Sequence, residues 1–117
     1  MTTDVTIYYN PVCSKSRQSL ELLEQQGAQV KIIEYLKTPP DAVTLEAILD
    51  MLGMEPRDLM RQHEKEYTGA GLDNPGLSRE QLIDAMIEHP RLIERPIVIR
   101  NGKARLGRPP ERILDIL

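Results

Sequence analysis

A short apolar run that breaks at a turn, with a cysteine and then a helical pattern after it, constrains this chain most. Residues 5–9 are strand formers, Asn10-Pro11 is a turn pair, and Cys13 comes just before a segment with helically spaced leucines. A thiol between a strand end and a helix start lies where unpaired backbone N–H groups and the helix dipole favour an anion. Such a position lowers a cysteine pKa, so the sequence predicts a reactive thiolate near neutral pH.

The residues around this thiol support that interpretation. Lys15 and Arg17 add positive charge close to Cys13, and Ser14 and Ser16 offer hydroxyl groups. The alternative is that Cys13 is a small buried hydrophobic residue, as most free cysteines are. The strand, turn and helix around it favour the reactive thiol.

The first third of the chain predicts a parallel strand pair. The expected elements are a strand at 5–9, a helix from near residue 13 or 14 to 26, and a strand at 30–36. A strand, helix and strand in so few residues imply a right-handed crossover, which places Cys13 at the carboxyl end of the first strand. Open α/β sheets bind their ligands at that end.

The rest of the chain predicts a helical insert, a hairpin and a last helix. The expected elements are a helix over 45–52, a short helix opened by Pro56, a loop over 67–76, a helix at 78–89 with a capping box at Ser78, strands at 96–100 and 103–106 joined by Asn101-Gly102, and a helix after Pro109. The order βαβ, helical insert, ββα predicts an α/β fold with a four-stranded mixed sheet. We expect a single domain over residues 1–117, with the insert at about 42–90.

Composition restricts the class of protein. One cysteine excludes an internal disulfide and a cysteine-only zinc site, so we expect a reducing cytoplasm and no bound metal or cofactor. Residues 1–4 lack the features of a signal peptide, and no stretch is long and apolar enough for a membrane span. Residues 91–117 carry seven basic and three acidic side chains, but this basic end has no aromatic residues to stack bases. We therefore expect neither a nucleic acid nor a membrane partner.

Four separated motifs carry a family resemblance. They are the segments 8–17, 35–39, 81–83 and 95–98, the first of which has the form Tyr-x-Asn-Pro-x-Cys-x-x-Ser-Arg. In order and over almost the whole chain they are similar to motifs of the glutaredoxin-coupled arsenate reductases (ArsC). The resemblance implies a thioredoxin-like fold with a helical insert and a cis proline before the third strand, which is Pro96 here.

The resemblance also implies a site for an oxyanion. The nucleophile matches Cys13, and the three arginines that bind arsenate match Arg61, Arg95 and Arg108. Forked guanidinium groups hold a doubly charged oxyanion in a bidentate way and favour a thiolate beside it. The residues expected to support this site are Asn10, Ser14, Ser16 and Pro96.

The implied reaction is attack of Cys13 on arsenic, with loss of hydroxide or water. Glutathione then adds as a co-substrate, glutaredoxin supplies the electrons, and arsenite leaves. A single cysteine fits this scheme because the other thiols come from outside. Ser16, in place of a second cysteine, excludes a two-thiol thioredoxin cycle.

Two features resemble a shorter, less characterised subfamily of these reductases. The residue before the Asn-Pro pair is Tyr9, where the longer reductases have a histidine, and tyrosine cannot carry positive charge to ionise Cys13. The chain ends at Leu117, without the C-terminal tail of the longer reductases. His63 and His89 are expected at the surface or at a helix end.

Two other functions stay open from the sequence. One is a glutathione-dependent thiol-disulfide reductase, in which the arginines hold the carboxylates of glutathione. The other is an interaction protein similar to the Spx-type regulators, which bind RNA polymerase. Those regulators usually have a second cysteine three residues after the first, and Ser16 stands at that place here.

Overall fold

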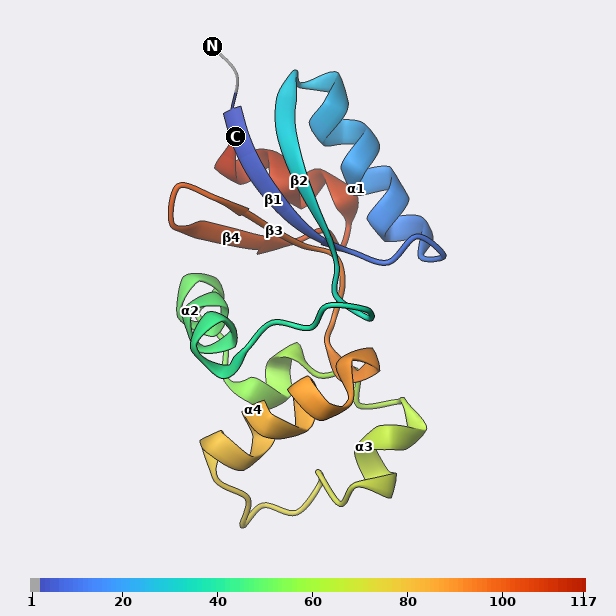
Figure 1. The fold of residues 1–117 in the computed structure, drawn as a ribbon, viewed down its shortest axis with the longest axis vertical. Helices are drawn as coiled ribbons and strands as arrows, with labels where there is room; N and C mark the ends of the chain where they lie inside the picture. Colours follow the sequence, from blue (N-terminus) through green and yellow to red (C-terminus); the bar gives the residue numbers. More distant parts are fainter. Residues whose placement is uncertain (1–2) are drawn as a thin grey trace. The chain divides into compact units, whose positions relative to one another are not determined.

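In the computed structural model, which describes residues 3–117, four strands form one mixed sheet in the order β2-β1-β3-β4 (Figure 1). The strands are β1 (Thr3–Tyr9), β2 (Ala28–Glu34), β3 (Ile97–Arg100) and β4 (Lys103–Leu106). β1 pairs parallel with β2 and antiparallel with β3, and β3 pairs antiparallel with β4. The expected α/β class with a four-stranded mixed, thioredoxin-like sheet is confirmed.

The second strand lies two residues earlier than predicted. It covers 28–34 instead of 30–36, because β1 begins at Thr3 and pairs that residue with Ala28. The strand ends where the backbone turns back, since the N–H groups of Lys37 and Thr38 both donate to Glu34 O at 3.0 Å.

Two helices cover one face of this sheet. They are α1 (Ser14–Gln25) and the 3₁₀ helix η3 (Pro110–Ile116). The buried cluster between sheet and helices consists of Val5, Ile7, Leu23, Val98, Ile113 and Ile116. The last helix was expected after Pro109, but it is a 3₁₀ helix, with bonds such as Arg112 N to Pro109 O at 3.1 Å. This packing fixes α1, and with it the residue at its N-terminus, against the sheet.

The connection between β3 and β4 is the predicted hairpin turn. Asn101 has φ 51° and Gly102 has φ 74°, which is the left-handed pair that an Asn-Gly turn adopts. The peptide bond before Pro96 is cis, as expected. The bond between Arg108 and Pro109 is also cis, which the sequence did not indicate.

The chain divides into two compact units, Met1–Thr38 with Arg95–Leu117 and Pro39–Glu94. The second unit contains α2 (Ala42–Leu52), η1 (Pro56–Leu59), α3 (Lys65–Gly69), α4 (Arg79–Glu88) and η2 (Pro90–Leu92). It includes the whole of the expected insert at 42–90. That the units form a single domain stays a prediction.

Local capping signals were reliable in the second unit. Ser78 Oγ accepts from Gln81 N at 3.1 Å, and Gln81 Oε1 accepts from Ser78 N at 2.8 Å, so both bonds of the predicted capping box are present. Gly53 ends α2 with φ 67°. The predicted loop at 67–76 was wrong at its start, because α3 extends to Gly69. This helix buries Tyr67, but five residues are too few to produce a helical sequence pattern.

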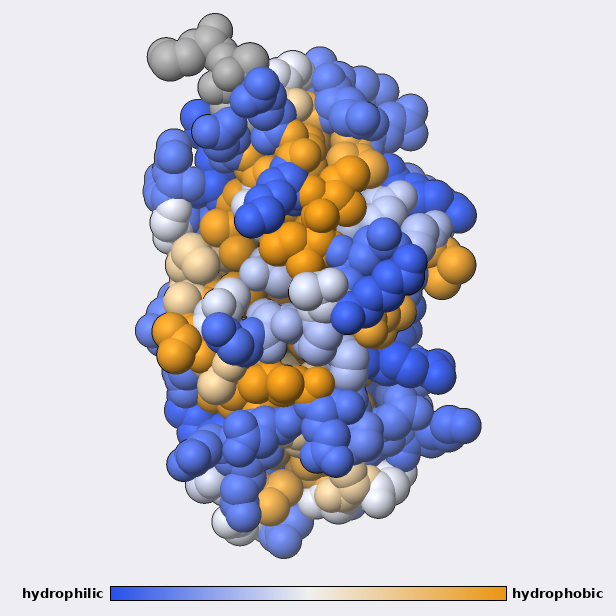
Figure 2. Space-filling view, viewed as in Figure 1, coloured by the Kyte–Doolittle hydropathy of each residue, from blue (hydrophilic) through white to orange (hydrophobic). Residues whose placement is uncertain are grey.

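Hydrophobic residues gather over β1 and β2 on the face that Figure 2 shows. A groove there is lined by Asp4, Val5, Thr6, Gln29, Val30 and Lys31. It lies along the first halves of the two strands and its lining does not include Cys13, so it is not the site of the predicted thiol nucleophile. Within residues 3–117, no helix has the length and apolar character that a membrane crossing needs.

Candidate active site around Cys13

Cys13 is held at the N-terminus of α1 by a tight turn. The Cys13 N–H donates to Asn10 O at 3.0 Å, and the buried Asn10 side chain accepts from Val12 N at 3.1 Å. The Cys13 carbonyl accepts the first helical bond from Arg17 N at 3.1 Å. Cys13 is thus the N-cap residue of α1, in an extended conformation. The residue is only 8% exposed.

Ser16 lies one turn into α1 and contacts the thiol twice. Its backbone N–H and its hydroxyl both hydrogen-bond to Cys13. The hydroxyl also accepts from Asn10 N at 3.4 Å, so its proton is available for the sulfur. Ser16 is completely buried, which orients these groups.

Burial and these hydrogen bonds shift the Cys13 pKa in opposite directions. Burial raises the pKa, because it disfavours the charged form. The Ser16 N–H, the Arg95 side chain and the Ser16 hydroxyl outweigh burial, and together with the Arg95 charge they lower the pKa from its ordinary 9.0 to about 7. The thiolate predicted from the sequence is therefore well populated at neutral pH.

The sheet register brings Arg95 to this site and places Arg108 beside Arg95. Tyr8 pairs with Ile97, and Ile97 pairs with Leu106, so the end of β1, the start of β3 and the end of β4 lie at one end of the sheet. Arg95 precedes β3 and Arg108 follows β4. The Arg108 Nε donates to Arg95 O at 2.8 Å, which joins the two arginine segments.

Arg61 belongs to the second unit, where acidic residues hold it. Its Nη1 lies 2.6 Å from Glu64 Oε1 and its Nε lies 3.8 Å from Glu94 Oε1. The side chains of Arg61 and Glu64 are each only 15% exposed. Glu64 also contacts Arg91, at 3.6 Å.

An isolated antiparallel β-bridge fixes the backbone of Arg61. The Arg61 N–H donates to Leu92 O at 2.6 Å and the Glu94 N–H donates to Leu59 O at 2.8 Å, on either side of a bridge between Met60 and Ile93. Arg61 thus follows η1, as predicted, in a defined position within its unit.

The other side chains that the sequence placed near the thiol do not shift its pKa. Ser14 and Arg17 are exposed, and Arg17 donates to Pro11 O at 3.4 Å. Among residues 3–117, the groups that shift the Cys13 pKa belong to Ser16 and Arg95, so the charge near the thiol comes from Arg95 instead of Lys15 and Arg17.

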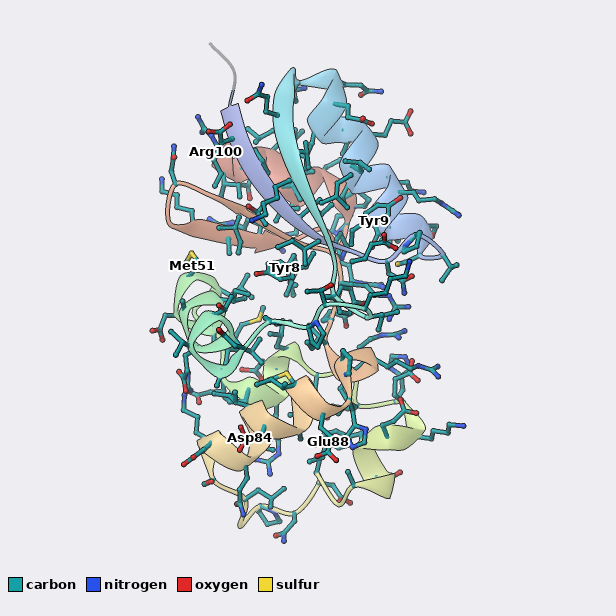
Figure 3. All side chains as sticks on the ribbon, viewed as in Figure 1. Tyr8, Tyr9, Met51, Asp84, Glu88 and Arg100 are labelled. Carbon is teal, nitrogen blue, oxygen red and sulfur yellow. The ribbon has the colours of Figure 1, made fainter. Side chains whose placement is uncertain are left out.

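The two histidines lie where the sequence predicted, at the surface and at a helix end, and Tyr9 packs within the first unit. Tyr9 ends β1 beside α1 and packs against the buried cluster that includes Leu23 (Figure 3). The His63 side chain is 69% exposed, and its Nε2 accepts from Arg61 Nη2 at 3.2 Å. His89 is the C-cap of α4.

Sequence reasoning missed Ser19, Gly107 and Glu64. Ser19 and Gly107 lie close to Pro96, and the only available signal was a glycine directly before Arg108. For Glu64 the only signal was its place three residues after Arg61, a spacing at which opposite charges can pair. Within residues 3–117, no group of three or more His, Cys, Asp and Glu side chains lies close enough to hold a metal ion.

Comparison with known proteins gives consistent matches over the full length. A family model described as "ArsC family" matches residues 8–116. The chain is 52% identical to "Uncharacterized protein YfgD" of Escherichia coli K12, over 100% of this chain and 99% of that protein. It is 46% identical to "Arsenate reductase" of Neisseria meningitidis serogroup B, over 97% and 98% of the two chains. A solved structure, "Arsenate reductase from Vibrio cholerae", superposes with a TM-score of 0.97 at 49% identity, and all of both chains is covered.

Proposed function

The chain belongs to the ArsC family, and from this membership we propose that it is an oxidoreductase that reduces arsenate to arsenite. The relatives from Neisseria and Vibrio are named arsenate reductases and match this chain over nearly their full length. The observation that carries the proposal is a single thiol with a pKa of about 7, hydrogen-bonded to an arginine at a helix N-terminus. A thiolate beside a guanidinium suits attack on an oxyanion.

In the proposed reaction, the Cys13 thiolate attacks arsenic and forms a sulfur–arsenic bond. One arsenate oxygen leaves as hydroxide, or as water once protonated. Glutathione then displaces a second oxygen as water and forms its own sulfur–arsenic bond. A glutaredoxin thiolate attacks the glutathione sulfur, so glutathione and glutaredoxin leave as a mixed disulfide and the electron pair of the broken sulfur–arsenic bond reduces arsenic(V) to arsenic(III). Water finally breaks the bond between Cys13 and arsenic(III), which releases arsenite and returns the thiol. The one cysteine of the chain fits a scheme in which the other thiols come from these two partners.

The proposed oxyanion ligands are Arg95, Arg108 and Arg61. Arg95 is supported by its bond to the thiol, because it would contact both the nucleophile and its target. Arg108 is supported by its bond to the Arg95 carbonyl, which orients its guanidinium. For Arg61 the support is the family resemblance alone, because the side-chain contacts of Arg61 lie within the second unit, where Glu64 holds its guanidinium.

A thiol-disulfide reductase is the second candidate, and Tyr9 is the observation that favours it. Tyrosine packs where the longer reductases have histidine, so the thiol is activated by Ser16 and Arg95 without a nearby imidazole. In this reaction Cys13 would attack a mixed disulfide with glutathione.

Arsenite production from arsenate, with glutathione and glutaredoxin present, tests the proposal. We expect turnover by the native protein and none by C13S, and a loss of turnover when either thiol source is omitted. Turnover without glutathione or glutaredoxin would contradict the electron source. No arsenite, with reduction of a glutathione mixed disulfide instead, would favour the second candidate.

A further inference from the structure

Gly107 makes an unusually close approach to two elements of the site. A Cβ atom built at this residue would overlap Ser19 Oγ and would lie 2.7 Å from Pro96 Cγ and 3.3 Å from Pro96 Cδ. Gly107 does not have the left-handed conformation that Gly102 has at the hairpin turn. The structure therefore requires glycine here for space, because any side chain would displace a neighbour.

The backbone around Gly107 holds the segment that carries Arg95. The Gly107 N–H donates to Pro96 O at 3.0 Å, and the next residue, Arg108, donates from Nε to Arg95 O at 2.8 Å. Two adjacent residues after β4 thus bond to the two adjacent carbonyls before β3. A shift at Gly107 would move both carbonyls together.

On its other side, Gly107 approaches α1, the helix that begins after Cys13. Ser16 and Ser19 lie about one turn apart in α1, and both are completely buried. Ser16 hydrogen-bonds to Cys13, whereas Ser19 Oγ has no hydrogen-bond partner within residues 3–117. We therefore attribute the serine at residue 19 to its small size, which leaves room for Gly107 and Pro96, and not to a polar contact.

We propose that Gly107 is a positioning residue, whose missing side chain lets the end of β4 pack on Pro96 and Ser19 and so holds the Arg95 guanidinium at Cys13. The proposal rests on the proposed function in one respect, that Cys13 is the reacting group. A methyl group at residue 107 would push Pro96 away from α1, and Arg95 would move with it. The thiolate would then lose the hydrogen bond and the charge that Arg95 supplies.

The test is a pH titration of the Cys13 thiolate, followed by its ultraviolet absorbance, in G107A. We expect the midpoint to rise by about one pH unit, which lowers the thiolate fraction at pH 7 about fivefold. The matched control is G69A, because a Cβ at Gly69 meets no atom within 4 Å and that glycine lacks a left-handed φ. G69A should titrate like the native protein. A folded G107A with the native midpoint would overturn the proposal.

A second variant covers the case in which G107A does not fold. In S19A/G107A the hydroxyl that overlaps the new methyl group is gone, while the contact with Pro96 at 2.7 Å stays. We expect a midpoint between those of the native protein and G107A. If only the double variant folds, a native midpoint in it overturns the proposal and a raised one supports it.

This titration separates the inference from the proposed function. It uses no arsenate, so a native protein that makes no arsenite would refute arsenate reduction without deciding whether Gly107 positions Arg95.

Discussion

Replacing Arg95 with alanine should raise the Cys13 pKa, because the Arg95 side chain supplies both a hydrogen bond and a positive charge to the sulfur. The native pKa is about 7 against an ordinary 9.0. At pH 7 about half of the native thiol is then ionised, compared with about 1% of an unperturbed one. The two Ser16 contacts remain in R95A, so we expect about half of the lowering to be lost and a pKa of about 8.

The rate of alkylation by iodoacetamide, measured as a function of pH, provides the assay. In R95A about 10% of the thiol is ionised at pH 7, compared with about half in the native protein. The thiolate of higher pKa is intrinsically more nucleophilic, by about threefold per pH unit. These effects partly cancel, so the rate at pH 7 falls only about twofold. The midpoint of the pH profile is therefore the informative quantity, and the plateau at high pH should rise.

A matched control comes from another arginine near the thiol. Arg17 is exposed and donates to Pro11 O, and it is not among the groups that shift the Cys13 pKa. R17A should keep the native midpoint. A midpoint in R95A within about 0.3 pH units of the native one would refute the assignment of Arg95 as the activating charge.

Three further predictions concern the neighbours of the site. S16A should raise the Cys13 pKa by less than R95A does, since the Ser16 N–H remains, and equal titrations of S16A and native protein would contradict this. S19A should leave the Cys13 pKa unchanged, because the Ser19 hydroxyl has no partner in residues 3–117. E64Q should raise the KM for arsenate about fivefold with little change in kcat, since Arg61 loses the nearer of its two carboxylate partners, and an unaltered KM would separate Glu64 from substrate binding. Thermal unfolding of native protein and C13S tests the linkage between ionisation and stability: the folded pKa of about 7 lies below the ordinary 9.0, so the thiolate's contribution is complete above pH 9 and is lost as the pH falls through 7. The melting temperature of the native protein relative to C13S should therefore rise from pH 7 to pH 9, and a constant difference would argue against a stabilised thiolate.

The sequence predicted well those features that short segments determine. Cys13 after a strand and a turn, the capping box at Ser78 and the Asn101-Gly102 turn each depend on a few adjacent residues, and the structure contains all three. The parallel pairing of β1 with β2 and the hairpin of β3 with β4 also followed from local elements, because a short crossover and a tight turn leave few alternatives.

The contacts that activate the thiol required the tertiary structure. Lys15 and Arg17 are close to Cys13 in sequence, but the charge comes from Arg95, which the register of β1 with β3 brings to the same end of the sheet. The need for glycine at Gly107 depends on atoms of α1 and of the segment before β3, so no local pattern could reveal it.

The most direct test of the central claim is the pH dependence of arsenite formation in a single turnover, compared between native protein, R95A and C13S. Arsenate changes its own charge near neutral pH, so the comparison between variants isolates the thiol. If the Cys13 thiolate attacks arsenate, the native rate will rise with a midpoint near 7, the R95A midpoint will lie about one pH unit higher, and C13S will form no arsenite. Arsenite formation by C13S, or a pH profile that R95A leaves unchanged, would contradict it.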